Sequence, residues 1–318
     1  MKSYFWFLFS ENKQLRFGLL FSFLIGLILI LPLILPQSCE AKVSLAGPFS
    51  DHMVLQRQAP IAVWGTASPG SVVGVRLGDK KAVSYPGADG KWQTLLDAME
   101  AGGPYELTVV SDNKIVLKDV MVGEVWLASG QSNMVLTNND IGYKVDGAFS
   151  GSIRFISLPP VTSSVPETRI EAGWQILDKN SQGACSAIAA AFALDLQKEL
   201  SVPVGIIVSA VGGSRVQSWV SRSGLETFPD GKSVAEKLDS TVSGLKRLKM
   251  PFRRLAVVTT VEEIDIRKDP ARQLFLSGAT LYNAMIAPLV PYSLKGVLWY
   301  QGEANVYEAQ TYGRFFST

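Results

Sequence analysis

Three predominantly apolar segments of this chain each run into a glycine turn that carries polar side chains. The segments are 120–128, 203–209 and 296–300, and the turns after them are Gly130-Gln131-Ser132, Gly212-Gly213-Ser214 and Gln301-Gly302-Glu303. Apolar runs of this length bounded by glycines are typical of buried strands. Open α/β sheets bind ligands at the carboxyl ends of their strands. The pattern therefore predicts that the three turns form one site, with Ser132 presented on a turn tight enough to need Gly130.

The segments between these strands have helical character. Residues 184–200 are rich in alanine, with apolar residues at helical spacing, and residues 281–289 read as a buried helix. A charged stretch, 230–272, is also expected to be largely helical. Alternation of strands with helices predicts a parallel sheet with crossover helices.

Residues 42–119 follow a different pattern, because short alternating strands are separated by glycine and proline turns. Residues 61–65 and 72–77 are the clearest of these strands, and the pattern favours a small sandwich or barrel. We therefore expect a small all-β domain over 42–119 and an α/β domain over 120–318.

The amino terminus resembles a targeting segment. Lys13 and Arg16 precede an uncharged apolar run over 17–35, and Cys39-Glu40-Ala41 fits a small-x-small cleavage site. The run is also long enough to span a bilayer. We expect export with cleavage after Ala41, with a retained membrane anchor as the alternative and lipid attachment at Cys39 as a weaker third. In each case the rest of the chain would lie outside the cytoplasm.

Composition narrows the function classes. The 318 residues carry a net charge of +2, with scattered lysines and arginines, so nothing favours a nucleic-acid partner. The chain has two cysteines and one histidine, which are too few for a zinc site of the usual ligands. Cleavage would remove Cys39, leaving Cys185 without a disulfide partner. We expect no metal and no cofactor.

A serine that attacks an ester needs a base to take its proton and donors to hold the oxyanion. Backbone N–H groups at Ser132 and Gly213 could be such donors, and Gln301 or Asn305 could add a side-chain amide. The base is harder to find. His52 lies in the β-rich part and reads as a surface-loop histidine with no triad partner nearby, and Glu303 alone is a weak base for serine.

The motifs are specific enough to indicate a family. Residues 123–134, Gly-Glu-Val-Trp-Leu-Ala-Ser-Gly-Gln-Ser-Asn-Met, closely resemble the signature block of the sialate O-acetylesterases, which are SGNH-type hydrolases of acetylated sugars. Further blocks in the same order extend the resemblance over most of the chain that would be exported. These are 49–57, 63–65, 205–219, 281–289 and 299–305.

The resemblance implies an SGNH-hydrolase-like parallel sheet flanked by helices and preceded by the small all-β domain. It implies Ser132 as nucleophile and oxyanion donor, Gly213 as second donor, and either Gln301 or Asn305 as third. It also implies a sugar pocket, for which the candidates are Gln131, Asn133, Arg215, Trp219 and Glu303. Trp219 has an alternative role as a lid over the core.

One departure from the family matters. The family's catalytic Asp and His arrive together near the carboxyl end of its hydrolase domain, and no Asp-x-x-His occurs in this chain. We therefore expect a carboxyl-terminally truncated sequence that lacks the proton-transfer pair, with an uncovered sheet edge, impaired activity and poor solubility.

The leading hypothesis is an exported serine esterase that removes O-acetyl groups from sialic acid or a related sugar. Two alternatives stay open. One is an esterase of acetylated xylan or another glycan, and the other is a non-catalytic glycan-binding protein. In each case the partner is a glycan, and a membrane is involved only through an uncleaved amino terminus.

Overall fold

The computed structural model describes residues 42–142, 151–251, 253–256 and 269–317. These described residues belong to one compact unit. The predicted targeting segment, with its apolar run over 17–35 and its cleavage site at Ala41, lies outside the described residues. Within the described ranges, no helix is long and apolar enough to cross a membrane.

A 17-residue strand, β8 (Lys114–Gly130), runs through both parts of the structure. Its first half pairs antiparallel with β7 (Gly102–Val110) and parallel with β2 (Val54–Gln56). Its second half lies between β12 (Val204–Ala210) and β14 (Gly296–Tyr300), parallel to both. The boundary expected at 119/120 therefore falls inside one continuous strand.

The carboxyl half of the sheet is largely parallel, as predicted. Its order is β11-β9-β12-β8, with β14 on the other side of β8. Strand β9 (Ile153–Ser157) is parallel to β12, and the short β11 (Gln175–Ile176) is antiparallel to β9.

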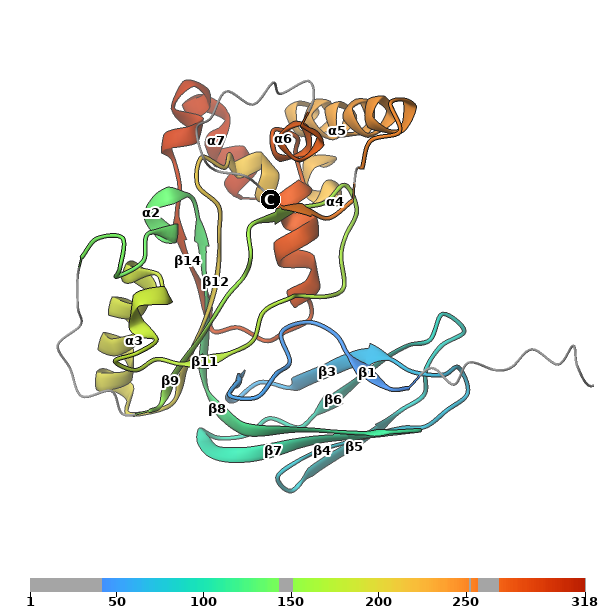
Figure 1. Ribbon diagram of the computed structural model, residues 1–318, viewed down its shortest axis with the longest axis vertical. Helices are drawn as coiled ribbons and strands as arrows, with labels where there is room; N and C mark the ends of the chain where they lie inside the picture. The colour runs from blue at the N-terminus through green and yellow to red at the C-terminus, as the bar shows by residue number, and fades with distance from the viewer. Residues whose placement is uncertain (1–41, 143–150, 252, 257–268, 318) are drawn as a thin grey trace, which may run out of the picture. The chain divides into compact units, whose positions relative to one another are not determined.

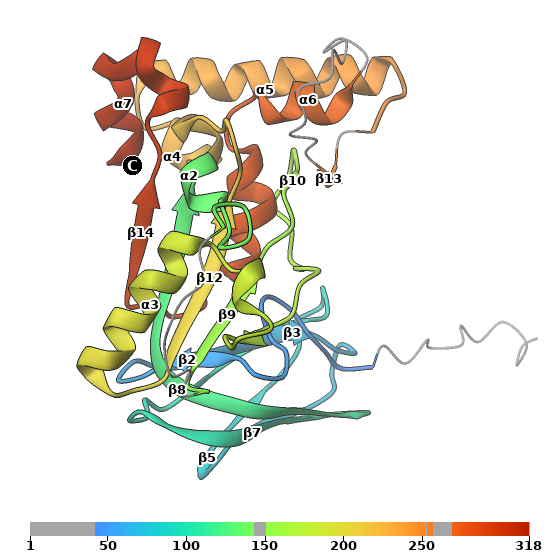
Figure 2. The same ribbon diagram turned by 60° about the vertical axis from the view of Figure 1, so that its left-hand side comes forward.

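A helical layer covers each face of this sheet, because successive apolar side chains of β12 point to opposite faces and both faces are buried. Helix α3 (Ala187–Leu200), capped by the Ser186 hydroxyl, packs on the face that carries Ile206 and Val208. A buried π-helical turn, η4 (Tyr282–Ile286), and a 3-10 turn, η5 (Ala287–Leu289), pack on the face with Ile207. Figures 1 and 2 show α3 on one side of β9, β12 and β8, and the 282–289 segment on the other.

The remaining helical segments gather near the carboxyl ends of the parallel strands (Figure 2). These segments are α2 (Ser132–Val135), η2 (Gln182–Ala184), η3 (Val216–Trp219), α4 (Arg222–Leu225), α5 (Pro229–Arg247), α6 (Pro270–Phe275), η6 (Glu303–Glu308) and α7 (Ala309–Phe316). The charged stretch predicted to be helical, 230–272, overlaps α5 and the start of α6, and part of it lies outside the described residues. Strand β10 (Val161–Thr162) pairs with β13 (Leu255–Ala256) beside them.

Residues 42–113 are all strand and turn in the structure, as the sequence predicts. One three-stranded sheet has the order β1-β3-β6, and β4 and β5 continue the large sheet beyond β7. These strands are β1 (Ser44–Leu45), β3 (Ile61–Thr66), β4 (Val73–Leu77), β5 (Lys80–Ser84) and β6 (Lys91–Leu96). A buried core that includes Met53, Val63 and Val122 joins them to the parallel sheet.

Candidate active site

The strand register brings the three predicted turns to one edge of the sheet. Gly130 at the end of β8 is level with Ala210 of β12 on one side and with Tyr300 of β14 on the other. Each strand then turns, and Figure 2 shows α2 directly above the end of β8. Because parallel strands end at a common edge, the turns after residues 130, 210 and 300 are neighbours in space.

The backbone around Gly130 presents Ser132 to solvent. Gly130 has φ +137°, and Gln131 is extended and donates its N–H to the Tyr300 carbonyl at 3.0 Å. Ser132 is the first residue of α2 and is exposed, whereas Met134 two residues later is buried and holds the turn against the core. The Ser132 hydroxyl makes no hydrogen bond within the described part of the chain.

Two backbone N–H groups, one in the first turn and one in the second, have no acceptor among the described residues. Those of Ser132 and Gly213 donate no hydrogen bond to any described residue. A Cβ built on Gly212 would lie 4.0 Å from the Ser132 Cβ, and one built on Gly213, which has φ +68°, would meet no atom within 4 Å. The second turn therefore runs alongside Ser132 and leaves open space there, as an oxyanion site requires.

The amide groups of Gln301 and Asn305 are both engaged in a network beneath the turns. Gln301 Nε2 contacts Gln131 Oε1 at 3.1 Å, the Ser214 carbonyl at 3.0 Å and Asn305 Oδ1 at 2.8 Å. Buried Asn305 also accepts from the Val216 N–H at 2.9 Å. Neither amide has an N–H to spare for a ligand in this arrangement.

The Gln131 side chain differs from those two amides. Its Oε1 accepts from Gln301 and from the Ala304 N–H at 3.0 Å, which fixes the side chain. Its Nε2 donates no hydrogen bond within the described residues. Gln131, predicted to bind substrate, is therefore held beside Ser132 with an uncommitted amide.

Two carboxylates border the site. Glu303 Oε1 accepts from Asn133 Nδ2 at 2.8 Å, so two predicted substrate-binding residues contact each other and link η6 to α2. Glu308, which the sequence analysis did not identify, accepts from Arg215 Nη1 at 3.3 Å and from Asn305 Nδ2 at 3.0 Å. No pattern in the sequence shows that η6 folds back over the second turn, so nothing there could have indicated Glu308.

Trp219, predicted either to line the sugar pocket or to form a lid over the core, is buried beneath the second turn. It is 8% exposed, its Nε1 donates to Ser214 Oγ at 2.9 Å, and its ring packs edge-to-face on Trp299 with centroids 6.2 Å apart. The indole thereby supports the Gly212-Gly213-Ser214 turn from below.

His52 lies in a turn with its side chain 43% exposed, and it pairs with a carboxylate that the sequence analysis did not identify. His52 Nδ1 lies 2.7 Å from Asp119 Oδ2, and Arg154 Nη2 lies 3.1 Å from the same oxygen. Asp119 precedes Gly130 by eleven residues on β8, which is roughly 35 Å along the strand at about 3.3 Å per residue. The His–Asp pair therefore lies far along the strand from Ser132.

Known proteins resemble this chain in sequence and in fold. No family model matches the chain. The mouse sialate O-acetylesterase is 30% identical, covering 88% of this chain and 55% of its own, and the human one is 29% identical, covering 87% and 52%. The crystal structure of a carbohydrate acetylesterase from Xanthomonas citri superposes with a TM-score of 0.68 at 30% identity, over 86% of this chain and 55% of that one. The predicted fold class is thereby confirmed, and the chain spans about half the length of the curated relatives it matches.

Proposed function

Since this chain is related to the sialate O-acetylesterases over most of its length, we propose that it is a serine esterase that removes acetyl groups from sugar hydroxyls. The observation that carries the proposal is the position of Ser132. It is exposed beside Gly212 and Gly213 at the carboxyl ends of three parallel strands, with backbone donors free around it.

In the proposed reaction the Ser132 oxygen bonds to the acetyl carbonyl carbon and loses its proton to a base. The carbonyl oxygen becomes an oxyanion held by the N–H groups of Ser132 and Gly213. The bond to the sugar oxygen then breaks, and that oxygen takes up a proton. A water molecule then loses a proton to the base and attacks the acetyl carbon of the acetyl-serine. The bond to the Ser132 oxygen breaks, that oxygen takes up a proton, and acetate is released.

The third oxyanion donor follows from the hydrogen bonds of the three candidate amides. Gln301 and Asn305 use their N–H groups within the network, whereas Gln131 Nε2 is uncommitted. We therefore propose Gln131 as the side-chain donor, with Gln301 and Asn305 as the residues that position it. Asn133, Glu303 and Arg215 would contact the sugar.

The base for Ser132 is not among the described residues around it. The only histidine of the sequence, His52, pairs with Asp119 far along β8. We propose that an Asp and His in the part of the relatives that this chain does not match would supply proton transfer. Without them, rates would be lower by orders of magnitude than those of a complete triad.

Two further parts of the proposal, export and the identity of the acetylated sugar, rest on fewer observations. The apolar run over 17–35 favours an exported protein. For the substrate, sialic acid is suggested by the curated relatives, and other acetylated glycans by the Xanthomonas enzyme.

The test compares the parent chain with Ser132→Ala, and with Ser240→Ala as a control for an exposed serine on α5. Acetate release is measured from an acetylated sugar and from p-nitrophenyl acetate, whose leaving group needs no proton, with and without added imidazole as external base. We expect slow release that imidazole accelerates in the parent and in Ser240→Ala. Ser132→Ala should lose about 10²-fold or more. Equal rates in parent and Ser132→Ala would contradict the assignment of the nucleophile.

A further inference from the structure

A cavity of about 410 Å³ lies in the β-rich part of the chain, between the β1-β3-β6 sheet and two segments of the carboxyl half. Residues 167–169 form a loop wall, and the other wall is made by Ala287 and Pro288 of η5 with Val290 after it. The volume is within the range of small-ligand sites. None of the residues around Ser132 lines this cavity, so it is separate from the candidate active site.

The strand register explains what the sheet wall presents. Residues paired directly across neighbouring strands point to the same face. Trp64 of β3 is opposite Gln93 of β6, and Thr66 is opposite both Lys91 of β6 and Ser44 of β1. One face of the sheet therefore carries an indole followed by a row of hydroxyl, amide and ammonium groups.

Neighbouring rings and a close backbone contact fix the indole of Trp64. Phe49 packs edge-on against it with ring centroids 4.6 Å apart, and the Tyr292 ring centroid lies 6.3 Å from that of Trp64. Gly47 has φ +65°, and a Cβ built there would be 2.5 Å from the Trp64 ring. The indole is thus held rigidly, half-buried, with its remaining surface on the cavity.

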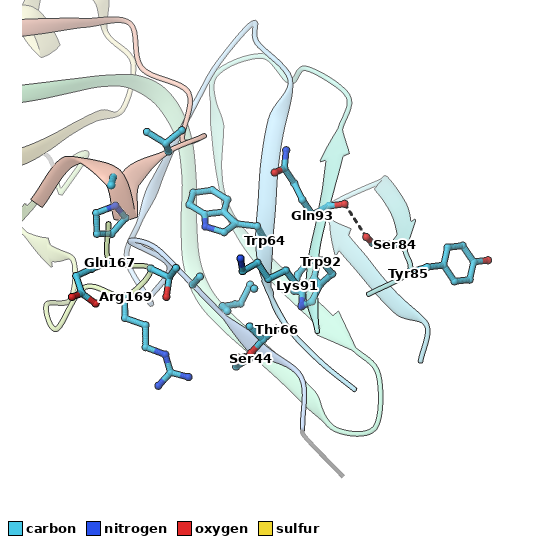
Figure 3. Close-up of a pocket in the computed structure, with 17 residues that line it drawn as sticks. Ser44, Trp64, Thr66, Ser84, Tyr85, Lys91, Trp92, Gln93, Glu167 and Arg169 are labelled. Atoms are coloured by element: carbon cyan, nitrogen blue, oxygen red, sulfur yellow. Dashed lines mark hydrogen bonds between the residues drawn. The ribbon is translucent and has the colours of Figure 1, made fainter. Parts of the chain in front are cut away.

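The loop wall adds charged groups. Glu167 is held by a hydrogen bond of 2.8 Å from Ser163 Oγ to its Oε1. Arg169 is exposed, and its guanidinium makes no ion pair with any described residue. Figure 3 shows Glu167 and Arg169 across from Trp64 and Lys91, whereas Tyr85 points away from them.

We propose that this cavity is a second, non-catalytic saccharide-binding site. A fixed aromatic surface suits the apolar face of a sugar ring, and the surrounding hydroxyl, amide, carboxylate and guanidinium groups suit its hydroxyls. Two glycan sources share this chemistry. A neutral chain such as xylan would use the ring face and hydroxyls alone, and an acidic one such as a sialylated glycan would also engage Arg169 through its carboxylate.

The experiment measures binding of xylo-oligosaccharide and of 3′-sialyllactose to the full chain by titration calorimetry. Parent, Trp64→Ala, Gln93→Ala and Ser132→Ala are compared, with Tyr307→Ala as a control for a fully exposed aromatic residue. We expect at least one probe to bind the parent, Ser132→Ala and Tyr307→Ala alike. Trp64→Ala should weaken that binding about tenfold or more. Gln93→Ala, at an exposed position that leaves the core intact, should weaken it several-fold and keeps the test valid if Trp64→Ala does not fold.

Arg169→Ala separates the two sources, with Arg76→Ala on β4 as the exposed arginine control. Weaker binding of 3′-sialyllactose alone supports an acidic glycan, and unchanged binding in both variants supports a neutral one. The proposal is overturned if neither probe binds the parent chain. It is also overturned if Ser132→Ala abolishes binding and Gln93→Ala leaves it intact. Because no turnover is measured, failure here leaves the esterase proposal standing.

Discussion

Gly130 lies so close to Tyr300 that a Cβ built on the glycine would be 2.1 Å from the tyrosine carbonyl oxygen. The same residue has φ +137°, a conformation that side chains rarely adopt. The turn that presents Ser132 therefore depends on glycine for both its conformation and the approach of β14 to β8.

Gly130→Ala should destabilise the fold and remove Ser132-dependent activity, because either the β8–β14 contact or the turn must shift. We expect a loss of at least about 2 kcal/mol in unfolding free energy, measured by urea denaturation. Gly302→Ala is the matched control, since a Cβ there meets nothing within 4 Å. Equal stability of the two variants would contradict the prediction.

Asn305→Ala should cost about 3 kcal/mol of stability, because it leaves the Val216 N–H and the Gln217 Oε1 buried without their partner. Denaturation of the purified variants measures this. Asn180→Ala, at an exposed asparagine, should leave stability unchanged. A small effect at Asn305 would mean that water replaces the amide.

An ion pair between partly buried Arg57 and buried Glu124 joins β8 to the segment after β2. Arg57 Nε lies 2.5 Å from Glu124 Oε1, and the Glu124 side chain is 3% exposed. Arg57→Met should cost about 3–5 kcal/mol, since it leaves the buried Glu124 carboxylate uncompensated. Glu124→Leu should cost less, because the Arg57 side chain is 22% exposed and its charge reaches solvent. The double variant should be less destabilised than the sum of the two, and purely additive costs in a double-mutant cycle would refute the coupling.

Burial raises the pKa of the Cys185 thiol to about 12 from its ordinary value of 9.0. The native thiol should therefore resist iodoacetamide at pH 8 and react once the chain is unfolded in guanidinium, with a Cys39→Ser background isolating Cys185. Because the folded state holds its proton more tightly, this group's contribution to stability is complete below pH 9 and is lost as the pH rises toward 12. Rapid alkylation of the folded chain would show that the helix α3 region opens.

The strands of the site could be predicted because their signal is local. The apolar run before Gly130 specifies a buried strand, and the glycine specifies the turn, so the position of Ser132 follows from a dozen adjacent residues. The parallel arrangement follows from the helices between the strands, and the structure confirms both.

Relations between distant segments could not be predicted in this way. His52 and Asp119 are 67 residues apart, and only the pairing of β2 with β8 brings them together. Likewise, the hydrogen bonds that commit the amides of Gln301 and Asn305 depend on how η6 folds over the second turn. Sequence spacing carries no information on either contact.

The continuity of β8 links the two halves of the chain mechanically. A slip of one residue in its register would turn inward-facing side chains outward both in the β-rich part and beside Ser132. We expect the two halves to unfold as one cooperative unit. A sugar bound against Trp64 should therefore raise the melting temperature of the part that carries Ser132 as well.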